Sequence, residues 1–193
     1  METKIIKDDE EFFVFKLNKG EVWLTNLLRR HILGQVSALA IDKVTFYENN
    51  SYMFDEYLAH RIGMVPILTP KDVKPSEEIF FTLDVQGPGE AVSGDLKSKS
   101  KDIKTVYDNM PLIQLREKQS IRLECVAKMG IPKIHQKFQA GLVSYDYSNS
   151  SSILFTVESY KNYPMAHDIV KNASENIKTK IEYYLSELDK IEV

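Results

Sequence analysis

Glu56 and His60 are the pair whose residue types and spacing most resemble a catalytic or metal-binding pair. They are four positions apart, and on a helix this spacing places two side chains on one face. Asp55 at the start and Gly63 beyond the end indicate a short helix here. A small metal-assisted hydrolase using Asp55, Glu56 and His60 is therefore one hypothesis. Because no nucleophile or further ligand is evident nearby, an ion-paired Glu–His couple with a structural role is favoured.

Arg29 and Arg30 are a second candidate, since they interrupt an otherwise apolar helical segment. A guanidinium group is planar and always charged, so it suits a carboxylate on a partner protein. The alternative is that both arginines are solvated residues at the rim of the core. The chain carries 25 Lys and Arg against 28 Asp and Glu, a net charge of −3. This balance disfavours phosphate as their target, and with it direct nucleic-acid binding.

Composition excludes several other classes of protein. The 193 residues are 43% hydrophobic and 27% charged, as in globular proteins. Cys125 is the only cysteine, which excludes an internal disulfide, a cysteine-ligated zinc site and an iron–sulfur cluster. No nucleotide-binding loop, nucleophile elbow or zinc-protease motif occurs. No apolar run approaches a membrane span of ~20 residues, and the charged N-terminus is unlike a signal peptide. We expect an intracellular, soluble protein without a catalytic set.

The elements that must position these residues follow from hydrophobic periodicity. The two ends of the chain repeat one theme, a strand of period two followed by an amphipathic helix. The predicted strands contain Phe13, Phe15 and Leu17 at one end and Ile153, Phe155 and Val157 at the other. The predicted helices span 21–35 and 164–188. A further strand is predicted over 39–47.

The middle of the chain has short alternating runs separated by Gly- and Pro-containing turns, which indicates a mostly β structure. We therefore predict an α+β fold with a discontinuous domain, a sheet plus two helices, formed by residues 1–45 and 148–193. A mostly β domain over 46–147 is inserted into it. Residues 148–152, Ser-Asn-Ser-Ser-Ser, are predicted to be a linker.

The predicted C-terminal helix is longer than its domain can cover. At ~1.5 Å per residue it would extend about 37 Å, whereas a compact domain of that size is about 30 Å across. Part of its apolar stripe would overhang and require another chain. Two alternatives stay open: the helix crosses its own sheet and frays after Ile181, or it closes an independent homodimeric interaction module.

Several segments together resemble one family. They read Asn-Leu-Leu-Arg-Arg at 26–30, Ala-Leu-Ala-Ile-Asp at 38–42, Asn-Asn-Ser at 49–51 and Asp-Glu-Tyr-Leu-Ala-His-Arg-Ile-Gly-Met-Val-Pro at 55–66. Gly-Asp-Leu-Lys-Ser at 94–98 and Gly-Ile-Pro-Lys-Ile-His-Gln-Lys-Phe at 130–138 follow in the same order. The sequence resembles the alpha-like subunits of multisubunit DNA-directed RNA polymerases, namely the D-type subunit of archaea and the third-largest subunit of eukaryotic polymerase II.

The resemblance implies a non-catalytic assembly subunit in transcription, cytoplasmic, or nuclear in a eukaryote. Its discontinuous domain would be a dimerisation domain that pairs with a small alpha-like subunit of the L type. The N- and P-type small subunits and the large catalytic subunits would then join this platform. The small size and the absent cysteine-rich domain favour an archaeal source.

The resemblance also implies roles for residues. Arg29 and Arg30 would contact a large subunit, Arg30 more directly, and the segment with Asp55, Glu56, His60 and Arg61 would serve insert-domain structure and subunit contacts. The implied heterodimer interface consists of apolar positions on the two helices: Leu24, Leu27, Leu28, Ile32, Val170, Ala173, Ile177, Ile181 and Tyr184.

The chain departs from the family pattern in two places. Many archaeal members carry a cysteine-rich domain before the last strand, sometimes with an iron–sulfur cluster, where this chain has a short serine-rich connector at 145–153. We therefore expect no cluster. In the last signature, Gln136 replaces the usual alanine and Phe138 replaces the usual tryptophan.

Overall fold

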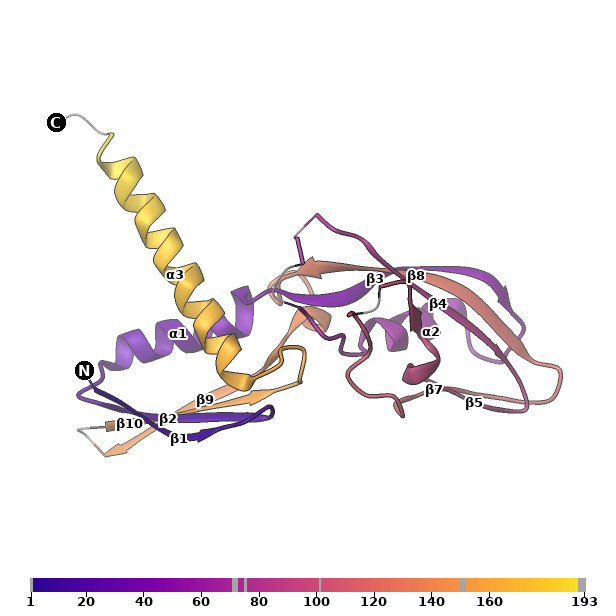
Figure 1. The fold of residues 1–193 in the computed structure, drawn as a ribbon, viewed down its shortest axis with the longest axis horizontal. Coiled ribbons are helices and arrows are strands. Elements are labelled where there is room, and N and C mark those ends of the chain that lie inside the picture. Colours follow the sequence, from indigo (N-terminus) through magenta and orange to yellow (C-terminus); the bar gives the residue numbers. More distant parts are fainter. Residues whose placement is uncertain (1, 71–72, 75, 101, 150–151, 191–193) are drawn as a thin grey trace. The chain divides into compact units, whose positions relative to one another are not determined.

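The computed structural model describes residues 2–70, 73–74, 76–100, 102–149 and 152–190. The chain forms two units, one of Met1–Val36 with Gln139–Val193 and one of Ser37–Phe138. We call them the terminal unit and the insert unit. Each combines helix with antiparallel strands, so the predicted α+β class is confirmed (Figure 1). No helix in the described part of the chain has both the length and the apolarity needed to cross a membrane.

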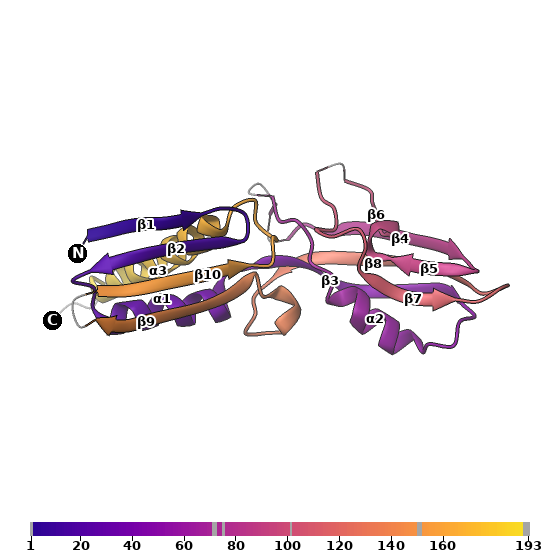
Figure 2. The ribbon, with the colours of Figure 1, turned by 90° about the horizontal axis from the view of Figure 1, so that it is seen from below.

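The terminal unit is built on a four-stranded antiparallel sheet with the order β1-β2-β10-β9. The strands are β1 (Glu2–Asp8), β2 (Phe12–Asn18), β9 (Gly141–Asn149) and β10 (Ser152–Ser159). Helices α1 (Val22–Gln35) and α3 (Ala166–Leu188) lie over the same face of this sheet (Figure 2). The chain ends thus build one layer of strands and one layer of helices.

Alternation along β2 creates the core of the terminal unit. Phe13, Phe15 and Leu17 are buried, while the residues between them are partly exposed. Phe15 pairs with Ile5 on one side and with Phe155 on the other, and the rings of Phe15 and Phe155 are 5.0 Å apart. Each buried side chain of this kind contributes about 1.5–3 kcal/mol, so the central strands hold the sheet and helices together.

Both predicted helices are present, with starts one or two residues later than expected. Glu21 is the residue before α1 and makes no side-chain capping bond, although its carbonyl accepts from Thr25 Oγ1 at 3.1 Å. Helix α3 begins at Ala166 after an extended Met165. Apolar periodicity therefore located the helices, whereas the capping chemistry at their starts is weak.

The insert unit contains a four-stranded sheet with the order β3-β8-β4-β6 and a separate two-stranded sheet, β5-β7. Its strands are β3 (Ala38–Asn49), β4 (Ile79–Gln86), β5 (Gly89–Val92), β6 (Lys97–Ser98), β7 (Pro111–Leu115) and β8 (Ser120–Gly130). Helix α2 (Asp55–Gly63) buries Leu58 and Ile62 in one hydrophobic core with Phe81 of β4 and Leu123 of β8. The unit is mostly β, as predicted from its turns.

The boundaries between the two units differ from those predicted from the sequence. The divisions fall after Val36 and after Phe138, not after residues 45 and 147. The strand predicted at 39–47 belongs to the insert unit, because β3 pairs with β8 from Ala38↔Gly130 to Asn49↔Ile121. Assigning it to the terminal domain was wrong, since local alternation does not reveal a strand's partner.

The predicted linker at 148–152 is also corrected. Strand β9 continues to Asn149 and β10 begins at Ser152, and the two strands pair with each other. Ser150 and Ser151 lie outside the described residues. Strand β1 was not predicted, because its Lys and Asp residues conceal the alternation.

Candidate functional site: an apolar groove and a projecting helix

An apolar groove of about 700 Å³ lies between α1, α3 and strands β1 and β2 of the terminal unit. Four elements contribute its apolar lining: Ile5, Phe13, Phe15, Leu17, Leu24, Leu28, Val170, Ile177 and Ile181. Lys178 and Glu182 of α3 add a charged pair, with 3.7 Å between Nζ and Oε1. Such a lining suits packing against an apolar surface of another protein.

Helix α3 continues beyond the groove. Its 23 residues give a length of about 35 Å at ~1.5 Å per residue. Every residue from Lys178 to Lys190 is exposed. In Figure 1 the C-terminal half of α3 extends away from the sheet of its own unit. The overhang expected from the length of this helix is thus present.

The exposed part of α3 has an apolar face. Ile181, Tyr184 and Leu188 are 50%, 65% and 60% exposed and follow one another at three- and four-residue spacing, so they share one side of the helix. Ile177, which lines the groove, continues the same stripe one turn earlier. Groove and projecting helix therefore form one continuous surface, which we call the α3 seam.

The structure separates the predicted interface residues into groups. Leu24, Leu28, Val170, Ile177 and Ile181 line the groove, and Tyr184 lies on the projecting helix. Ile32 and Ala173 are 2% and 0% exposed. They belong to the unit's own core and are removed from the interface prediction. Helical spacing does not distinguish a side chain that faces its own sheet from one that faces a partner.

Leu27 lies apart from the groove. It is 38% exposed and lines a second hollow of about 530 Å³ on α1, so its place in the interface stays a prediction. Trp23, Arg30 and His31 line the same hollow.

The two arginines have different surroundings. Arg29 donates from Nε and Nη2 to Asn26 Oδ1 at 3.3 and 3.0 Å, which holds it along its own helix. Arg30 is exposed in the second hollow. Of the pair, Arg30 thus presents the more accessible guanidinium group.

His31 lies where α1 meets α3. Burial, assisted by the charge of Lys180, lowers the pKa of His31 below its usual value. Within the described part of the chain its Nε2 has no hydrogen-bond partner. Lys180 Nζ donates to Gln35 Oε1 at 3.2 Å, so a polar contact also joins the two helices.

The helix with the catalytic candidates does not assemble a catalytic site. Asp55, Glu56, His60 and Arg61 are all exposed. Asp55 Oδ1 accepts from Asn49 Nδ2 at 2.6 Å, and Arg61 Nη2 donates to the Pro111 carbonyl at 2.6 Å. The favoured ion pair between Glu56 and His60 does not form. Within the described residues, neither side chain contacts a polar partner.

Metal binding likewise receives no support. Among the described residues, no three His, Cys, Asp or Glu side chains are grouped to hold a metal ion. The metal-assisted hydrolase hypothesis for Asp55, Glu56 and His60 is therefore not supported by the geometry.

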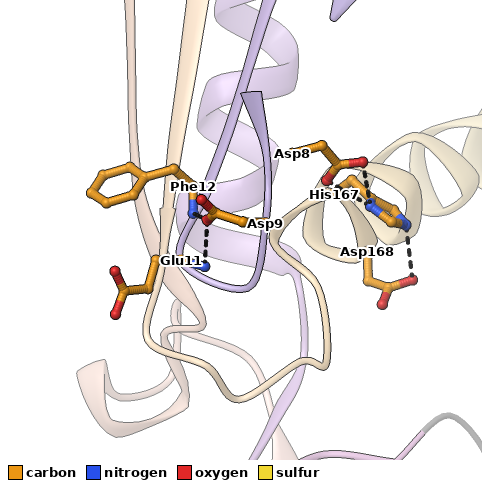
Figure 3. A network of polar contacts seen from close by, with 6 residues as sticks. All are labelled: Asp8, Asp9, Glu11, Phe12, His167 and Asp168. Atoms are coloured by element: carbon orange, nitrogen blue, oxygen red, sulfur yellow. Dashed lines mark hydrogen bonds and ion pairs between the residues drawn. The ribbon is translucent and has the colours of Figure 1, made fainter. Parts of the chain in front are cut away.

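A polar junction that the sequence did not predict holds the start of α3 (Figure 3). His167 Nδ1 lies 2.9 Å from Asp8 Oδ1 and its Nε2 lies 3.9 Å from Asp168 Oδ1. The Asp9 carbonyl accepts from the Ala166 amide at 3.1 Å. These contacts attach α3 to the end of β1, and so orient the helix that carries the seam.

Asp9 also shapes the turn between β1 and β2. Its Oδ1 accepts from the amides of Phe12 at 2.6 Å and Glu11 at 2.9 Å (Figure 3). The bond from Phe12, helped by Lys7, lowers the pKa of the Asp9 carboxyl. No residue of this junction stood out in the sequence, because the junction joins the two ends of the chain. Asp8 and His167, for example, are 159 positions apart.

Comparison with known proteins identifies the family. The family described as RNA polymerase Rpb3/RpoA insert domain matches residues 44–146. This match covers more than half of the 193 residues. The chain belongs to this family of RNA polymerase subunits. The match includes the segments at 49–51, 55–66, 94–98 and 130–138 on which the resemblance was based.

Curated relatives agree with this assignment. The chain is 37% identical over 182 residues to DNA-directed RNA polymerase subunit Rpo3 of Methanocaldococcus jannaschii, covering 94% of the chain and 93% of the relative. It is 38% identical over 168 residues to Rpo3 of Pyrococcus furiosus, covering 83% and 64%. With Rpo3 of Halobacterium salinarum the identity is 45% over 117 residues, covering 61% and 47%.

The relatives differ in length. The chain spans 64% and 60% of the relatives from Pyrococcus furiosus and Pyrococcus horikoshii, but nearly all of the one from Methanocaldococcus jannaschii.

Proposed function

We propose that the chain is an assembly subunit of a DNA-directed RNA polymerase and that it contributes no chemistry of its own. Its terminal unit forms a heterodimer with a small alpha-like subunit of the L type, which covers the α3 seam. Family membership supports the polymerase assignment. The single observation that carries the role is the exposed apolar face of α3, continuous with the groove.

The physical argument for a partner is the amount of apolar surface left uncovered. Ile181, Tyr184, Leu185 and Leu188 are each at least half exposed on consecutive turns. Burial of apolar surface contributes about 25 cal/mol per Å², so a partner that covers these residues and the groove gains a large driving force. Paired helices from the two chains are the simplest cover, because helices α1 and α3 of this chain both line the groove.

Further subunits join this heterodimer in the proposal. The N- and P-type small subunits bind the platform, and the large catalytic subunits follow. Arg30, exposed on α1 beside Trp23, contacts a carboxylate of a large subunit, with Arg29 beside it. Asp55, Glu56, His60 and Arg61 serve contacts of the insert unit. The complex acts in the cytoplasm, or in the nucleus of a eukaryote.

We also propose that the chain holds no iron–sulfur cluster. Cys125 is its one cysteine, and it is buried in β8. Burial raises the pKa of its thiol to about 12, which opposes the thiolate form that ligates metals. Iron and acid-labile sulfide assays on the purified heterodimer should detect neither.

Co-expression tests the main proposal. The chain is produced alone and with an L-type subunit, and the mass of each product is measured by light scattering after gel filtration. We expect a one-to-one heterodimer, and self-association or poor solubility of the chain alone. A well-behaved monomer that ignores the L-type subunit would refute the proposal. A stable homodimer that excludes it would instead establish an independent homodimeric module.

A further inference from the structure

Of the four histidines, which all lie in the described ranges, only His31 is buried, and none of the roles above uses it. Its side chain is 8% exposed, and Nε2 has no hydrogen-bond partner in the described part of the chain. A neutral imidazole tolerates this position, because one of its ring nitrogens carries no hydrogen. An imidazolium carries a hydrogen on both nitrogens. Protonation would therefore bury a charged donor without an acceptor, which is costly.

His31 lies where the two helices of the terminal unit meet. Helices α1 and α3 pack against each other, and α3 buries Ala173 against its own unit. Lys180 follows Ala173 by seven positions, about two helical turns, so it continues the same side of α3. Its Nζ donates to Oε1 of Gln35 at 3.2 Å, and Gln35 is one turn after His31 on α1. The buried ring is therefore part of the contact between the helices.

The charges near His31 on the helices are positive. Lys180 acts on the ring from α3. Among the described residues, the lining of the hollow beside His31 includes Arg30 and no Asp or Glu. Glu21, the nearest carboxylate along α1, precedes His31 by ten positions, about 15 Å of helix. The helices thus offer no carboxylate that could stabilise an imidazolium at this position.

The neighbouring elements do not supply a carboxylate either. Strand β9 packs against α1, and its Tyr145 pairs with the buried Phe155, so a phenol faces the helices. Asp146 points to the other side of the sheet, because side chains alternate along a strand. Asp168 belongs to the junction at the start of α3, twelve positions before Lys180. Within the described residues, a protonated His31 would therefore face Lys180 without a compensating charge.

We propose that His31 is a pH-dependent switch in the contact between α1 and α3: the neutral ring packs between the helices, and the protonated ring loosens α3 from α1. Burial, assisted by the charge of Lys180, lowers the pKa of His31 in the folded chain, so the unfolded chain binds this proton more tightly. The stabilisation by the neutral ring is complete above the usual pKa of histidine. It is lost as the pH falls through the lowered pKa of the folded chain.

Loosening α3 also disturbs the α3 seam. The groove needs both helices, because Leu24 and Leu28 of α1 and Ile177 and Ile181 of α3 line it. The heterodimer with the L-type subunit should therefore be weaker in acid. This consequence rests on the proposed function, whereas the switch itself is a property of the chain alone.

Proton NMR of the full chain tests the switch. The ring signal of His31, assigned by its loss in His31→Leu, is followed from about pH 8 to about pH 5, the range in which histidines titrate. We expect it to titrate at a lower pH than in the same chain in urea, and the backbone amides of α1 and α3 to change with it. Titration at the same pH in both states, or titration without a change in those amides, would overturn the inference.

Two pairs of variants test the chemistry. In urea unfolding, acid should lower the folding equilibrium constant of the unmodified chain severalfold more than that of His31→Leu, and His60→Leu, at an exposed histidine, should behave as the unmodified chain. Lys180→Gln should move the titration of His31 to higher pH, because a like charge is removed. Lys178→Gln, on another side of α3, should move it much less. Equal acid sensitivity of His31→Leu and the unmodified chain, or equal shifts in the two lysine variants, would contradict the switch. If His31→Leu does not fold, the lysine pair decides.

The affinity for the L-type subunit tests the consequence for assembly. It should fall severalfold between about pH 8 and about pH 5, and fall less in His31→Leu. No fall in the unmodified chain, or an equal fall in His31→Leu, would refute the effect on the seam. If the L-type subunit binds at no pH, the proposed function fails, and the NMR titration of the chain alone still decides whether the switch exists.

Discussion

Ile181→Asp is the substitution that best distinguishes an effect on heterodimer assembly from an effect on the folding of this chain. Ile181 lies where the groove passes into the projecting part of α3, and it is 50% exposed. An aspartate at this position stays in water while the chain is alone, so the folded unit tolerates it. In the proposed heterodimer the same carboxylate is buried against an apolar surface.

The expected loss of affinity for the L-type subunit follows from the exposed fraction of Ile181. Burying a whole isoleucine side chain contributes about 1.5–3 kcal/mol, so covering the exposed half contributes roughly 1 kcal/mol, which the variant loses. Desolvating a carboxylate without a partner adds at least about 2 kcal/mol. The sum of about 3 kcal/mol corresponds to a loss of roughly 100-fold in the affinity for the L-type subunit. The stability of the isolated chain should change by less than about 1 kcal/mol.

Calorimetric titration with an L-type subunit measures the affinity, and urea unfolding of the chain alone measures the stability. Tyr183→Asp is the matched control, since Tyr183 is 60% exposed and two residues away, on nearly the opposite side of the helix at ~100° per residue. We expect the control to bind as the unmodified chain does. Equal affinity of Ile181→Asp and the unmodified chain would refute the α3 seam. Equal losses in both variants would indicate damage to the helix end and not burial in an interface.

Three further outcomes are expected. Arg30→Ala should leave heterodimer affinity unchanged and weaken recruitment of a large subunit, measured by pull-down; undiminished recruitment would remove that role. Cys125, with its pKa raised to about 12, should resist alkylation in the native chain and react quickly in urea; rapid native labelling would contradict its burial. Bonds from Lys128 and Lys137 lower the pKa of Asp42, so its stabilisation is present above the unfolded pKa and is lost as pH falls through the lowered pKa. Asp42→Asn should therefore cost on the order of 1 kcal/mol at neutral pH and little once the pH lies below the lowered pKa of Asp42; a cost independent of pH would exclude the charge as its source.

Local patterns predicted the elements of this fold well where hydrophobic periodicity is strong. The alternation of Phe13, Phe15 and Leu17 and the stripe along α3 each correspond to the element they predicted. Strand β1 was missed because its charged residues conceal its pairing with β2. The strand at 39–47 was assigned to the wrong unit because its partner, β8, is distant in the sequence.

The candidate site was predictable only where it depends on the periodicity of one helix. The stripe on α3 identified Ile177, Ile181 and Tyr184, but it also included Ala173, which the unit buries itself. Ile5, from the strand that the sequence did not reveal, lines the groove. Spacing along one helix defines a face, whereas only packing against other elements decides whether that face is already covered.

The sequence by itself determined the α+β class, the two amphipathic helices, the excess length of α3 and the likeness to polymerase subunits, because these depend on residue order within short segments. The tertiary structure decided where the two units divide, which apolar residues remain exposed, and that Asp8 and His167 join β1 to the start of α3. Those features depend on contacts between residues far apart in the chain, and the free energy of such contacts is absent from any local pattern.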